Sequence, residues 1–444
     1  METIRQYSFR VFTAAAVLFC CQACDNGDNG EEDAAGEDAV AQDSDAADMA
    51  QDDAAQEPEE EIEEDADEDA QDAAGEELAA GWQEPAPWKS PIADYIDWAI
   101  EEKGLSIDAF DHALKELSVF DDRLYFGYGD WTENLGPVDI RYFDDPEGDF
   151  TVEFTIEEES IDYYRIFSDT CYIPGVDAKE DGLLGNVFYK PSEGDWVKVR
   201  DLDYALHVLD VMEYDGALYA CGGGCIDMDH YYAGRDESVI WKSEDGGDTW
   251  EVVLEEMTDT ADDVARWERF VKTSGRLYCF GQVTTSTAEG AYFSNDHRQF
   301  VSGAWHEAGI LPQVLVMHTH QFNADRGIVI GLSFDAEPTF TAYSVQDFGT
   351  VELAFLRDGG ARTLDVFMEN EGQALFLTRS GAGYPDEEGA PFTYSVVRTT
   401  DLDAFEELLA FESSEVIMSI ASWRESLYMG TRQGDILRSV FVSP

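Results

Sequence analysis

One short stretch of the 444-residue chain decides its fold: Ser243-Glu244-Asp245-Gly246-Gly247-Asp248-Thr249-Trp250, which has the pattern S-x-D-x-G-x-T-W. The pattern is typical of the tip of a β-hairpin. Asp and Ser side chains hydrogen-bond the amides of a turn, and Gly adopts the positive φ that tight turns need. The tryptophan can then pack beneath the turn. The stretch therefore predicts a hairpin turn between two strands.

Five further stretches repeat this turn in degraded form, each after a β-rich segment and each ending in an aromatic residue. The closing aromatics of all six turns lie 46, 54, 50, 48 and 57 residues apart. The six turns are Asp144–Phe150, Pro191–Trp196, Ser243–Trp250, Ser294–Phe300, Ser344–Phe348 and Thr399–Phe405.

A second marker, a turn followed by a hydrophobic and aromatic strand start, runs in step with the first. Its seven copies begin at Asp121, Cys171, Asp215, Ser274, Arg326, Glu371 and Glu425. Copies spaced by roughly fifty residues indicate radial repetition, with one four-stranded sheet in each unit. The sequence therefore predicts an all-β protein, a β-propeller with seven blades rather than six or eight.

The seventh unit is incomplete, because the chain stops at Pro444 before a seventh closing aromatic. An open blade edge would invite aggregation, so the ring has to be closed. We expect residues 82–90 to supply the missing outer strand. Residues 93–116 are predicted to contain a short helix that Gly104 ends, and the first strand of blade one is expected within 109–120.

The intact turn resembles the Asp-box of sialidase-type (BNR-repeat) β-propellers, and the wider resemblance covers about residues 110–440. It implies the fold more than an activity, because this family includes glycosidases, sorting receptors and assembly factors without catalysis. It also implies that the turn joins the third and fourth strands of a blade, on the face opposite the usual ligand site. On this reading the motif is structural. Its residues are Ser243, Asp245, Gly247, Thr249 and Trp250.

The first residues have the features of a bacterial export signal. Two arginines precede the short apolar run Val11–Phe19, which is too short to span a membrane as a stable helix. Ala23-Cys24 resembles the lipobox of bacterial lipoproteins, although Cys21 stands where that box usually has Leu. We expect residues 1–24 to be a lipoprotein-type signal peptide with Cys24 as the lipidation site. The alternatives are lipidation at Cys20 or Cys21, and cleavage without a lipid.

Charge divides the rest of the chain into a linker and a domain. Residues 25–80 contain 25 Asp or Glu and no Lys or Arg, a composition that predicts a disordered acidic tether. Residues 81–444, the predicted propeller, contain 70 acidic and 25 basic residues. That charge argues against nucleic-acid binding and allows cationic partners or divalent metals. Adaptation to a saline habitat would explain the same composition.

Four cysteines lie in the predicted propeller, an even number that permits two disulfides, in any of three connectivities, in an exported chain. Cys221 and Cys225 are separated only by three glycines, which are flexible enough to let this pair close. We therefore predict a Cys221–Cys225 disulfide. A zinc site is disfavoured, because the domain has no C-x-x-C pair.

The longest insertions fall where the second and third strands of a blade should be joined, on the face expected to bind ligands. They are 130–137, 174–185, 222–238, 333–340 and 379–392. Long loops on one rim of a rigid scaffold are where binding usually resides, and aromatic side chains among carboxylates suit a sugar or a cationic peptide. The predicted ligand-binding residues are Asp130, Trp131, Asp227, Asp229, His230, Tyr231, Asp335 and Tyr384.

Metal and catalytic motifs are weak. His318 and His320 fall on one face of a strand, as some metal sites require, but Val314 and Val316 share that face and favour a packed pair. Asp227-Met228-Asp229-His230 could bind Ca²⁺ but lacks the full calcium-loop pattern. We therefore assign no metal site, no catalytic residue and no cofactor, and leave Ca²⁺ open. Arg165-Ile166 is the nearest match to the Arg-Ile-Pro motif of sialidases, without its proline.

Two functions follow from these features. The first is a non-catalytic binding or scaffolding propeller, monomeric and lipid-anchored in the bacterial cell envelope, whose acidic, aromatic rim holds a protein or glycan partner. The second is a glycan-acting hydrolase that uses two rim carboxylates. These features leave open whether the protein is an enzyme, and they favour a protein without catalysis.

Overall fold

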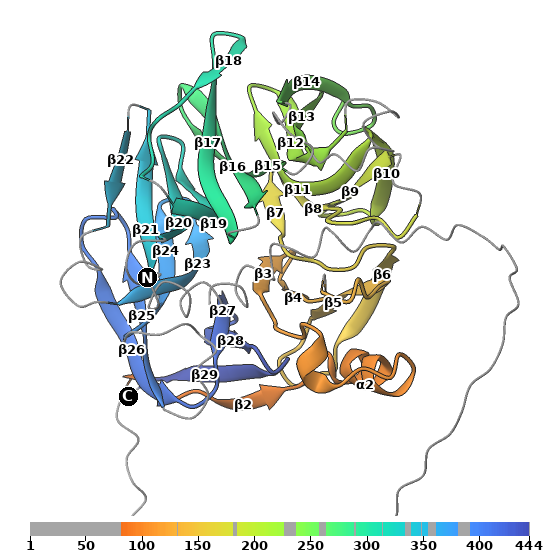
Figure 1. Cartoon of the computed structure of the whole chain (residues 1–444). Helices are drawn as coiled ribbons and strands as arrows, with labels where there is room; N and C mark the ends of the chain where they lie inside the picture. Colours follow the sequence, from red (N-terminus) through yellow and green to blue (C-terminus); the bar gives the residue numbers. More distant parts are fainter. Residues whose placement is uncertain are drawn as a thin grey trace, which may run out of the picture.

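The computed structural model describes residues 81–443 except for 131, 181–183, 226–236, 257–262, 288–289, 313, 334–338, 348, 354–360 and 381–390; the side chains of 263, 285–287 and 290–296 are also left out. Its strands form seven antiparallel sheets that are arranged as blades around a central axis (Figure 1). The predicted seven-bladed β-propeller is confirmed.

Six blades run in chain order from the inner to the outer strand. Blade 1 is β3 (Glu116–Phe120), β4 (Arg123–Gly127), β5 (Val138–Phe143) and β6 (Thr151–Ile156). Blade 2 is β7 (Arg165–Phe167), β8 (Thr170–Pro174), β9 (Leu184–Pro191) and β10 (Val197–Asp203). Blade 3 is β11 (Ala205–Tyr214), β12 (Ala217–Gly224), β13 (Glu237–Ser243) and β14 (Glu251–Glu256).

The next three blades repeat this order. Blade 4 is β15 (Asp263–Thr273), β16 (Arg276–Thr287), β17 (Gly290–Val301) and β18 (Ala304–Glu307). Blade 5 is β19 (Val314–Asn323), β20 (Arg326–Ser333), β21 (Thr339–Gln346) and β22 (Gly349–Glu352). Blade 6 is β23 (Arg362–Asn370), β24 (Gln373–Arg379), β25 (Phe392–Thr399) and β26 (Glu406–Ser413).

Blade 7 is built from both ends of the described chain. Its first three strands are β27 (Ile417–Trp423), β28 (Ser426–Thr431) and β29 (Ile436–Val442), and its outer edge is β1 (Gly81–Trp82) and β2 (Ala86–Lys89). Both N-terminal strands pair antiparallel with β29, which lies beside β2 in Figure 1. The prediction that residues 82–90 close the ring is confirmed.

The N-terminal segment also joins blade 7 to blade 1. The Trp88 ring lies 4.7 Å from that of Phe143 in blade 1 and 4.8 Å from that of Tyr428 in blade 7. It continues into α2 (Ala93–Glu101) and the 3-10 turn η2 (Ile107–Ala109). The helix ends before Gly104, whose φ is +72°, and β3 begins at residue 116, as the sequence predicts.

One predicted turn is wrong. Residues 294–300 lie within the long strand β17, and the turn that follows it is Ser302-Gly303, with φ of +54° and +82°. The closing aromatic of this unit is therefore Trp305, in β18, rather than Phe300. The other five turns fall where the third strand of a blade meets the fourth, in blades 1, 2, 3, 5 and 6.

The five long insertions each connect the second and third strands of a blade, as predicted, in blades 1, 2, 3, 5 and 6. Turns between the third and fourth strands lie at the opposite ends of these strands, because neighbouring strands are antiparallel. We call the end with the long insertions the rim face and the other end the Asp-box face. In the described part of the chain, no helix has the length and apolar character needed to cross a membrane.

Candidate functional site

Each blade places one polar side chain in its inner strand, 5 to 8 residues before its second strand begins. In five of these strands the residue follows directly on a shift in strand register, a bulge of the kind that re-aims a side chain. We call these seven residues the channel ring. They are Glu116, Arg165, Asp210, Arg269, His318, Asp365 and Ser419.

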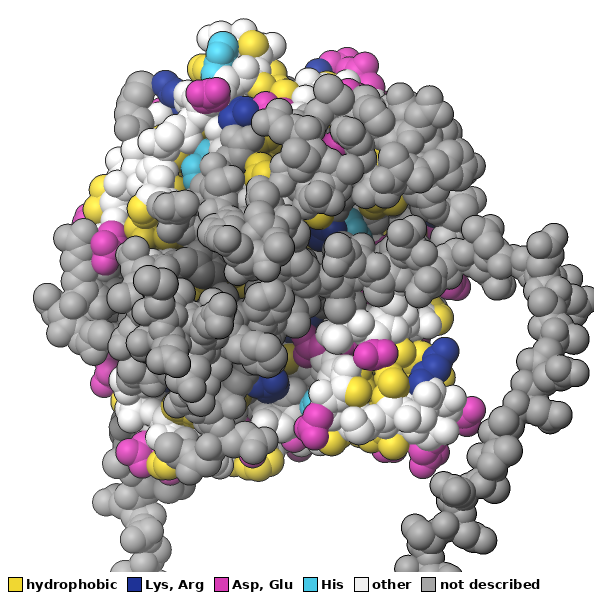
Figure 2. Space-filling model, in the orientation of Figure 1, with side chains coloured by type: hydrophobic (Ala, Val, Ile, Leu, Met, Phe, Trp, Pro, Cys, Tyr) yellow, Lys and Arg dark blue, Asp and Glu magenta, His cyan; other side chains and the backbone are white. Residues whose placement is uncertain are grey.

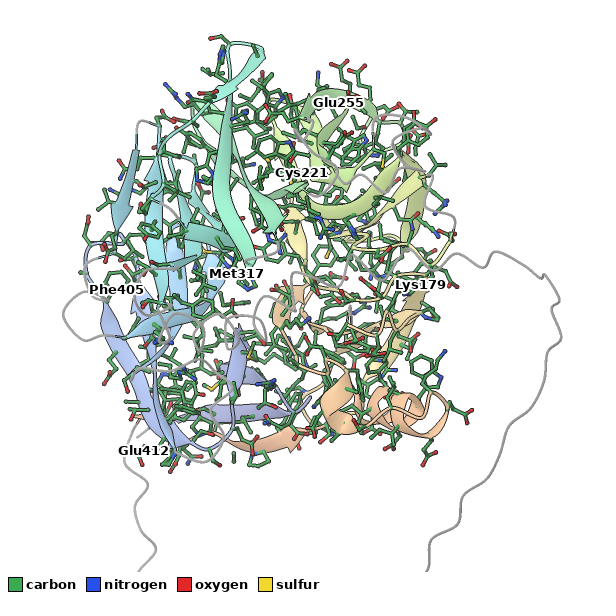
Figure 3. All side chains as sticks on the ribbon, viewed as in Figure 1. Lys179, Cys221, Glu255, Met317, Phe405 and Glu412 are labelled. Carbon is green, nitrogen blue, oxygen red and sulfur yellow. The ribbon has the colours of Figure 1, made fainter. Side chains whose placement is uncertain are left out.

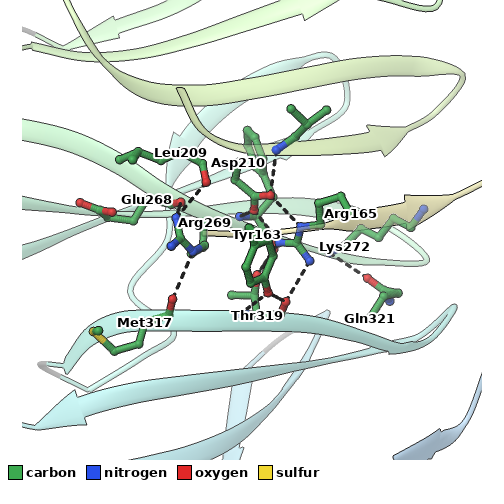
Figure 4. A network of polar contacts seen from close by, with 12 residues as sticks. Tyr163, Arg165, Leu209, Asp210, Glu268, Arg269, Lys272, Met317, Thr319 and Gln321 are labelled. Carbon is green, nitrogen blue, oxygen red and sulfur yellow. Dashed lines mark hydrogen bonds and ion pairs between the residues drawn. The ribbon is translucent and has the colours of Figure 1, made fainter. Parts of the chain in front are cut away.

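Arg165 contacts three other blades near the centre of the ring. Its Nε and Nη2 donate to the two carboxylate oxygens of Asp210 at 2.7 and 2.5 Å. Nη1 donates to the carbonyl oxygen of Thr319 at 2.9 Å, and Nη2 also donates to the Thr319 hydroxyl at 2.6 Å and to the Phe270 carbonyl at 3.1 Å. Blades 2 and 5 are not neighbours, so the contact with Thr319 crosses the axis (Figure 4).

Tyr163 belongs to the same network. The Thr319 amide donates to the Tyr163 hydroxyl at 3.0 Å, and the hydroxyl donates back to the Thr319 carbonyl. The guanidinium carbons of Arg165 and Arg269 lie 4.5 and 5.1 Å from the centre of the Tyr163 ring (Figure 4). Both arginines are thus held by cation–π contacts as well as by hydrogen bonds.

Arg269 is engaged with backbone carbonyls rather than carboxylates. Its Nη1 donates to the Leu209 and Glu268 carbonyls at 2.9 and 2.7 Å, and its Nε donates to the Met317 carbonyl at 3.1 Å. Met317 lies near the centre of the molecule in the view of Figure 3. Arg269 therefore ties the inner strands of blades 3, 4 and 5 together.

Two aspartates of the channel ring make the same clamp in different blades. Asp210 accepts from the amide of Val211 at 2.8 Å and from that of Phe270, in the next blade, at 2.7 Å. Asp365 accepts from the amide of Val366 and from that of Ile420, in the next blade, both at 2.8 Å. Each aspartate thus fastens its inner strand to the inner strand that follows.

Glu116 and Asp365 also belong to the channel ring. Among the described residues, neither carboxyl accepts a hydrogen bond from an arginine, in contrast to Asp210. Burial raises the pKa of Asp365 above its usual range. Burial and the neighbouring Asp365 charge raise that of Glu116 well above its usual range, against the opposing effect of Arg165 and Arg269. Two like charges in a desolvated site cannot both ionise cheaply, so ionisation of one carboxyl disfavours ionisation of the other.

His318 and His320 are buried beside Tyr163, with ring centres 6.0 and 6.2 Å from its own. Burial lowers the pKa of His318 to about 3, and burial together with His318 lowers that of His320 as well. Both rings are therefore neutral at pH 7. Among the described residues, no group of three or more His, Cys, Asp or Glu side chains could hold a metal ion.

The rim face has a second pair of buried carboxyls, in the connection from blade 1 to blade 2. Glu158 accepts from the Asn186 side chain at 2.5 Å and from the Asp177 amide at 3.1 Å. The Lys179 ammonium lies 3.6 Å from Glu159, on the blade 2 side of the molecule (Figure 3). Burial raises the pKa of Glu158 to about 8, and burial followed by the Asp177 charge raises that of Glu159.

The expectation that Asp130 offers a carboxylate to a ligand is wrong. Asp130 is fully buried, and its two oxygens each accept at 2.6 Å from a backbone amide, those of Asp111 and Glu133. It fastens the N-terminal segment to the first rim insertion. A sequence cannot distinguish this arrangement from an exposed loop aspartate, because the Asp111 amide comes from outside the loop.

The other predicted ligand-binding residues lie outside the described part of the chain, as does the predicted lipidation site Cys24. They are Trp131, Asp227, Asp229, His230, Tyr231, Asp335 and Tyr384. Their assignment stays a prediction.

The turn Ser243–Trp250 between β13 and β14 has the hydrogen bonds that its sequence suggests. Asp245 accepts from the Thr249 amide at 2.9 Å, from the Thr249 hydroxyl at 2.6 Å and from the Ser243 hydroxyl at 2.8 Å. The amide of Gly247, with φ of +104°, donates to Ser243, and the Trp250 indole donates to the Gly247 carbonyl at 3.0 Å. The hydrogen bonds that Asp245 accepts from Thr249 and Ser243 lower its pKa to about 2. Asp245 is thus occupied within its own turn.

Replacing Asp245 with Ala should lower the melting temperature, because three hydrogen bonds of the turn lose their acceptor. We expect a shift of about 1–3 °C, the effect of losing a capping side chain. Scanning calorimetry on the full chain measures it. Asp245→Asn, which keeps an acceptor, should lose less, and Asp248→Ala in the same exposed turn should change nothing. Equal shifts for Asp245→Ala and Asp248→Ala would contradict the role given to this turn.

The predicted Cys221–Cys225 disulfide does not fit the strand geometry. Cys221 lies in the middle of β12 and Cys225 directly follows that strand. Four residues of extended chain span about 13 Å, whereas disulfide-bonded Cα atoms lie within about 7 Å. The intervening glycines serve close packing instead: a Cβ on Gly222 would lie 1.8 Å from the His207 carbonyl oxygen.

The channel ring was not predicted from the sequence, although a signal for it exists. Its members recur 45 to 59 residues apart, in step with the blade repeat. Their types differ from blade to blade, so a search for identical residues does not find them. An alignment of the seven units on the turn between their first and second strands would bring them close to one column.

The chain is similar to known proteins in its architecture. No family model matches the sequence, and no curated protein matches it. Among solved structures, the chain is similar to a streptogramin B lyase structure, with 12% identity over 75% of this chain and 94% of that chain and a TM-score of 0.46. It is similar to YCF48 bound to D1 peptide, with 11% identity, 75% and 96% coverage and a TM-score of 0.41.

A third similar structure is the β-propeller domain of the Trilobed protease from Pyrococcus furiosus. The identity is 10%, the coverage is 72% of this chain and 90% of that chain, and the TM-score is 0.42. These proteins include both an enzyme and a peptide-bound protein. Identities this low do not transfer either property.

Proposed function

We propose that the protein is a non-catalytic binding or scaffolding propeller, monomeric and held in the bacterial cell envelope by a lipid anchor, that recruits a cationic partner to its acidic rim face. The observation that carries the proposal is the contact of Arg165, in blade 2, with Thr319, in blade 5, across the centre of the ring. The centre of the ring is therefore bridged by the protein's own side chain, which favours the rim as the place for a partner.

The described part of the rim supports the choice of a cationic partner. Glu133 and Glu157 are exposed there. Elsewhere on the described surface, Figure 2 shows acidic side chains recurring along the outline of the molecule, with basic side chains singly or in small groups among them. A surface of this charge attracts cations over roughly a Debye length, about 8–10 Å at physiological salt.

The alternative function, a glycan hydrolase, receives less support from the carboxyls with raised pKa. Glu158 is fully buried, and both its oxygens already accept hydrogen bonds. Each carboxylate oxygen of Asp365 accepts a hydrogen bond from a backbone amide. Arg165, the nearest match to a sialidase arginine, has all three nitrogens engaged within the protein. A substrate would have to displace these contacts.

A salt titration tests the proposal. The full chain should bind octalysine, and the dissociation constant should rise at least tenfold between about 0.05 and 0.5 M salt, because exposed charges are then screened. Isothermal titration calorimetry measures both values. Octaglutamate is the matched probe of opposite charge and should not bind.

The acidic tether would also attract octalysine, so the decisive comparison is a full-length variant with Asn and Gln in place of every Asp and Glu in 25–80. The proposal expects this variant to keep binding with the same steep salt dependence. Loss of binding in the neutral-tether variant, or a dissociation constant indifferent to salt, would overturn it.

A further inference from the structure

We propose that Cys221 and Cys279 form a disulfide that ties blade 3 to blade 4 when the protein folds in an oxidising compartment. The two residues lie in the second strands of adjacent blades, β12 and β16, and are thiols in the structure. Their side chains are in hydrogen-bonding contact. Both are fully buried in one hydrophobic cluster that includes Trp267, Phe270 and Leu277.

The strand register explains why the two sulfurs meet. Cys221 is the cross-strand partner of Asp210, and Cys279 is the cross-strand partner of Phe270. The Phe270 amide donates to the Asp210 carboxylate at 2.7 Å, which holds the two inner strands at the same height. The cysteines therefore stand at equivalent heights in neighbouring sheets and face each other across the blade interface. In Figure 3, Cys221 is labelled where blades 3 and 4 meet.

The chemistry is a two-step exchange with a donor disulfide. The thiolate of one cysteine attacks the donor and releases one donor thiol, and the second cysteine then displaces the other donor thiol from the mixed disulfide. Two cysteine thiols lose two protons and two electrons, and the donor disulfide is reduced to two thiols. The donor is a thiol–disulfide oxidoreductase in an exported setting, or glutathione disulfide in the test tube.

Burial sets the order of events. Neither sulfur is accessible once blade 3 has packed on blade 4, so the exchange has to precede that packing. A reductant added to the folded protein should act slowly for the same reason. The inference concerns the covalent structure of the scaffold and does not depend on what the rim binds.

Peptide mapping tests the bond directly. The full chain is unfolded and refolded with a glutathione redox pair, its remaining thiols are alkylated in denaturant, and a non-reduced digest is analysed by mass spectrometry. We expect a peptide pair joined through Cys221 and Cys279, which separates after reduction. Unlinked, alkylated Cys221 and Cys279 after oxidative refolding would overturn the proposal, as would a link from either to another cysteine.

A thermal measurement supplies the second readout. The bond closes a loop of about 59 residues, so reduction in denaturant before refolding should lower the melting temperature by about 5 °C. Cys221→Ser and Cys279→Ser should be indifferent to reductant. Cys171→Ser, which alters a buried thiol of blade 2, is the matched control and should stay as sensitive as the natural protein. An equal response of Cys171→Ser and Cys279→Ser would contradict the assignment.

Discussion

Replacing Arg165 with Leu should lower the free energy of unfolding by about 3–5 kcal/mol, because Asp210 would then be a buried charge without its partner. Arg165 is 6% exposed and Asp210 is fully buried, so solvent screens neither group. The substitution also removes the donors to Thr319 and Phe270. Urea unfolding of the full chain, followed by tryptophan fluorescence, measures the loss.

Two variants distinguish the loss of the buried Arg165–Asp210 ion pair from a non-specific effect of replacing an arginine. Arg424→Leu removes an arginine that pairs with Asp122 at 2.7 Å on the surface, and it should leave the urea midpoint unchanged. The double variant Arg165→Leu/Asp210→Leu should recover part of the stability, because no lone charge is left buried. If Arg165→Leu were as harmless as Arg424→Leu, the channel network would not stabilise the ring.

Stability should fall as pH rises from about 4.5 to about 8, and Glu158 should account for part of that slope. Its pKa is about 8 in the folded protein, whereas an unfolded glutamate has about 4.3. Between these values the unfolded chain releases a proton that the folded protein keeps. Ionisation therefore favours unfolding, by at most about 1.4 kcal/mol per pH unit for this group, and the loss is complete above pH 8.

Urea midpoints measured from pH 5 to pH 9 test this sign and its source. Glu158→Gln should flatten the curve, because Gln keeps an oxygen that can accept from Asn186 and cannot ionise. Glu157→Gln changes the exposed neighbour and is the matched control, expected to run parallel to the natural protein. Parallel curves for Glu158→Gln and Glu157→Gln would rule out Glu158 as the source.

Local sequence signals were enough to predict the blades. A hairpin turn with its flanking aromatic is encoded within about eight residues, so the turn at Ser243–Trp250 and most of its degraded copies fall where expected. Because a propeller has to close its ring, the sequence also predicted that the segment containing β1 and β2 forms the outer edge of blade 7. The turn at 294–300 was misplaced because β17 continues past an apparent turn signal.

The candidate site could not be predicted in the same way, because its contacts join distant parts of the chain. Arg165 and Thr319 are separated by 154 residues, and only ring closure brings them together. Asp130 looked like an exposed loop carboxylate until the Asp111 amide was placed against it. The cysteines show the same limit: proximity in sequence suggested Cys221 with Cys225, whereas strand register puts Cys221 beside Cys279.

The claim that a cationic partner is recruited to the rim face is tested most directly by hydrogen exchange on the full chain with and without saturating octalysine. We predict slower exchange in peptides covering rim segments, including 130–137 and 157–180, and unchanged exchange in the Asp-box turn at 243–250. Protection confined to the Asp-box face, or to the tether at 25–80, would contradict the account.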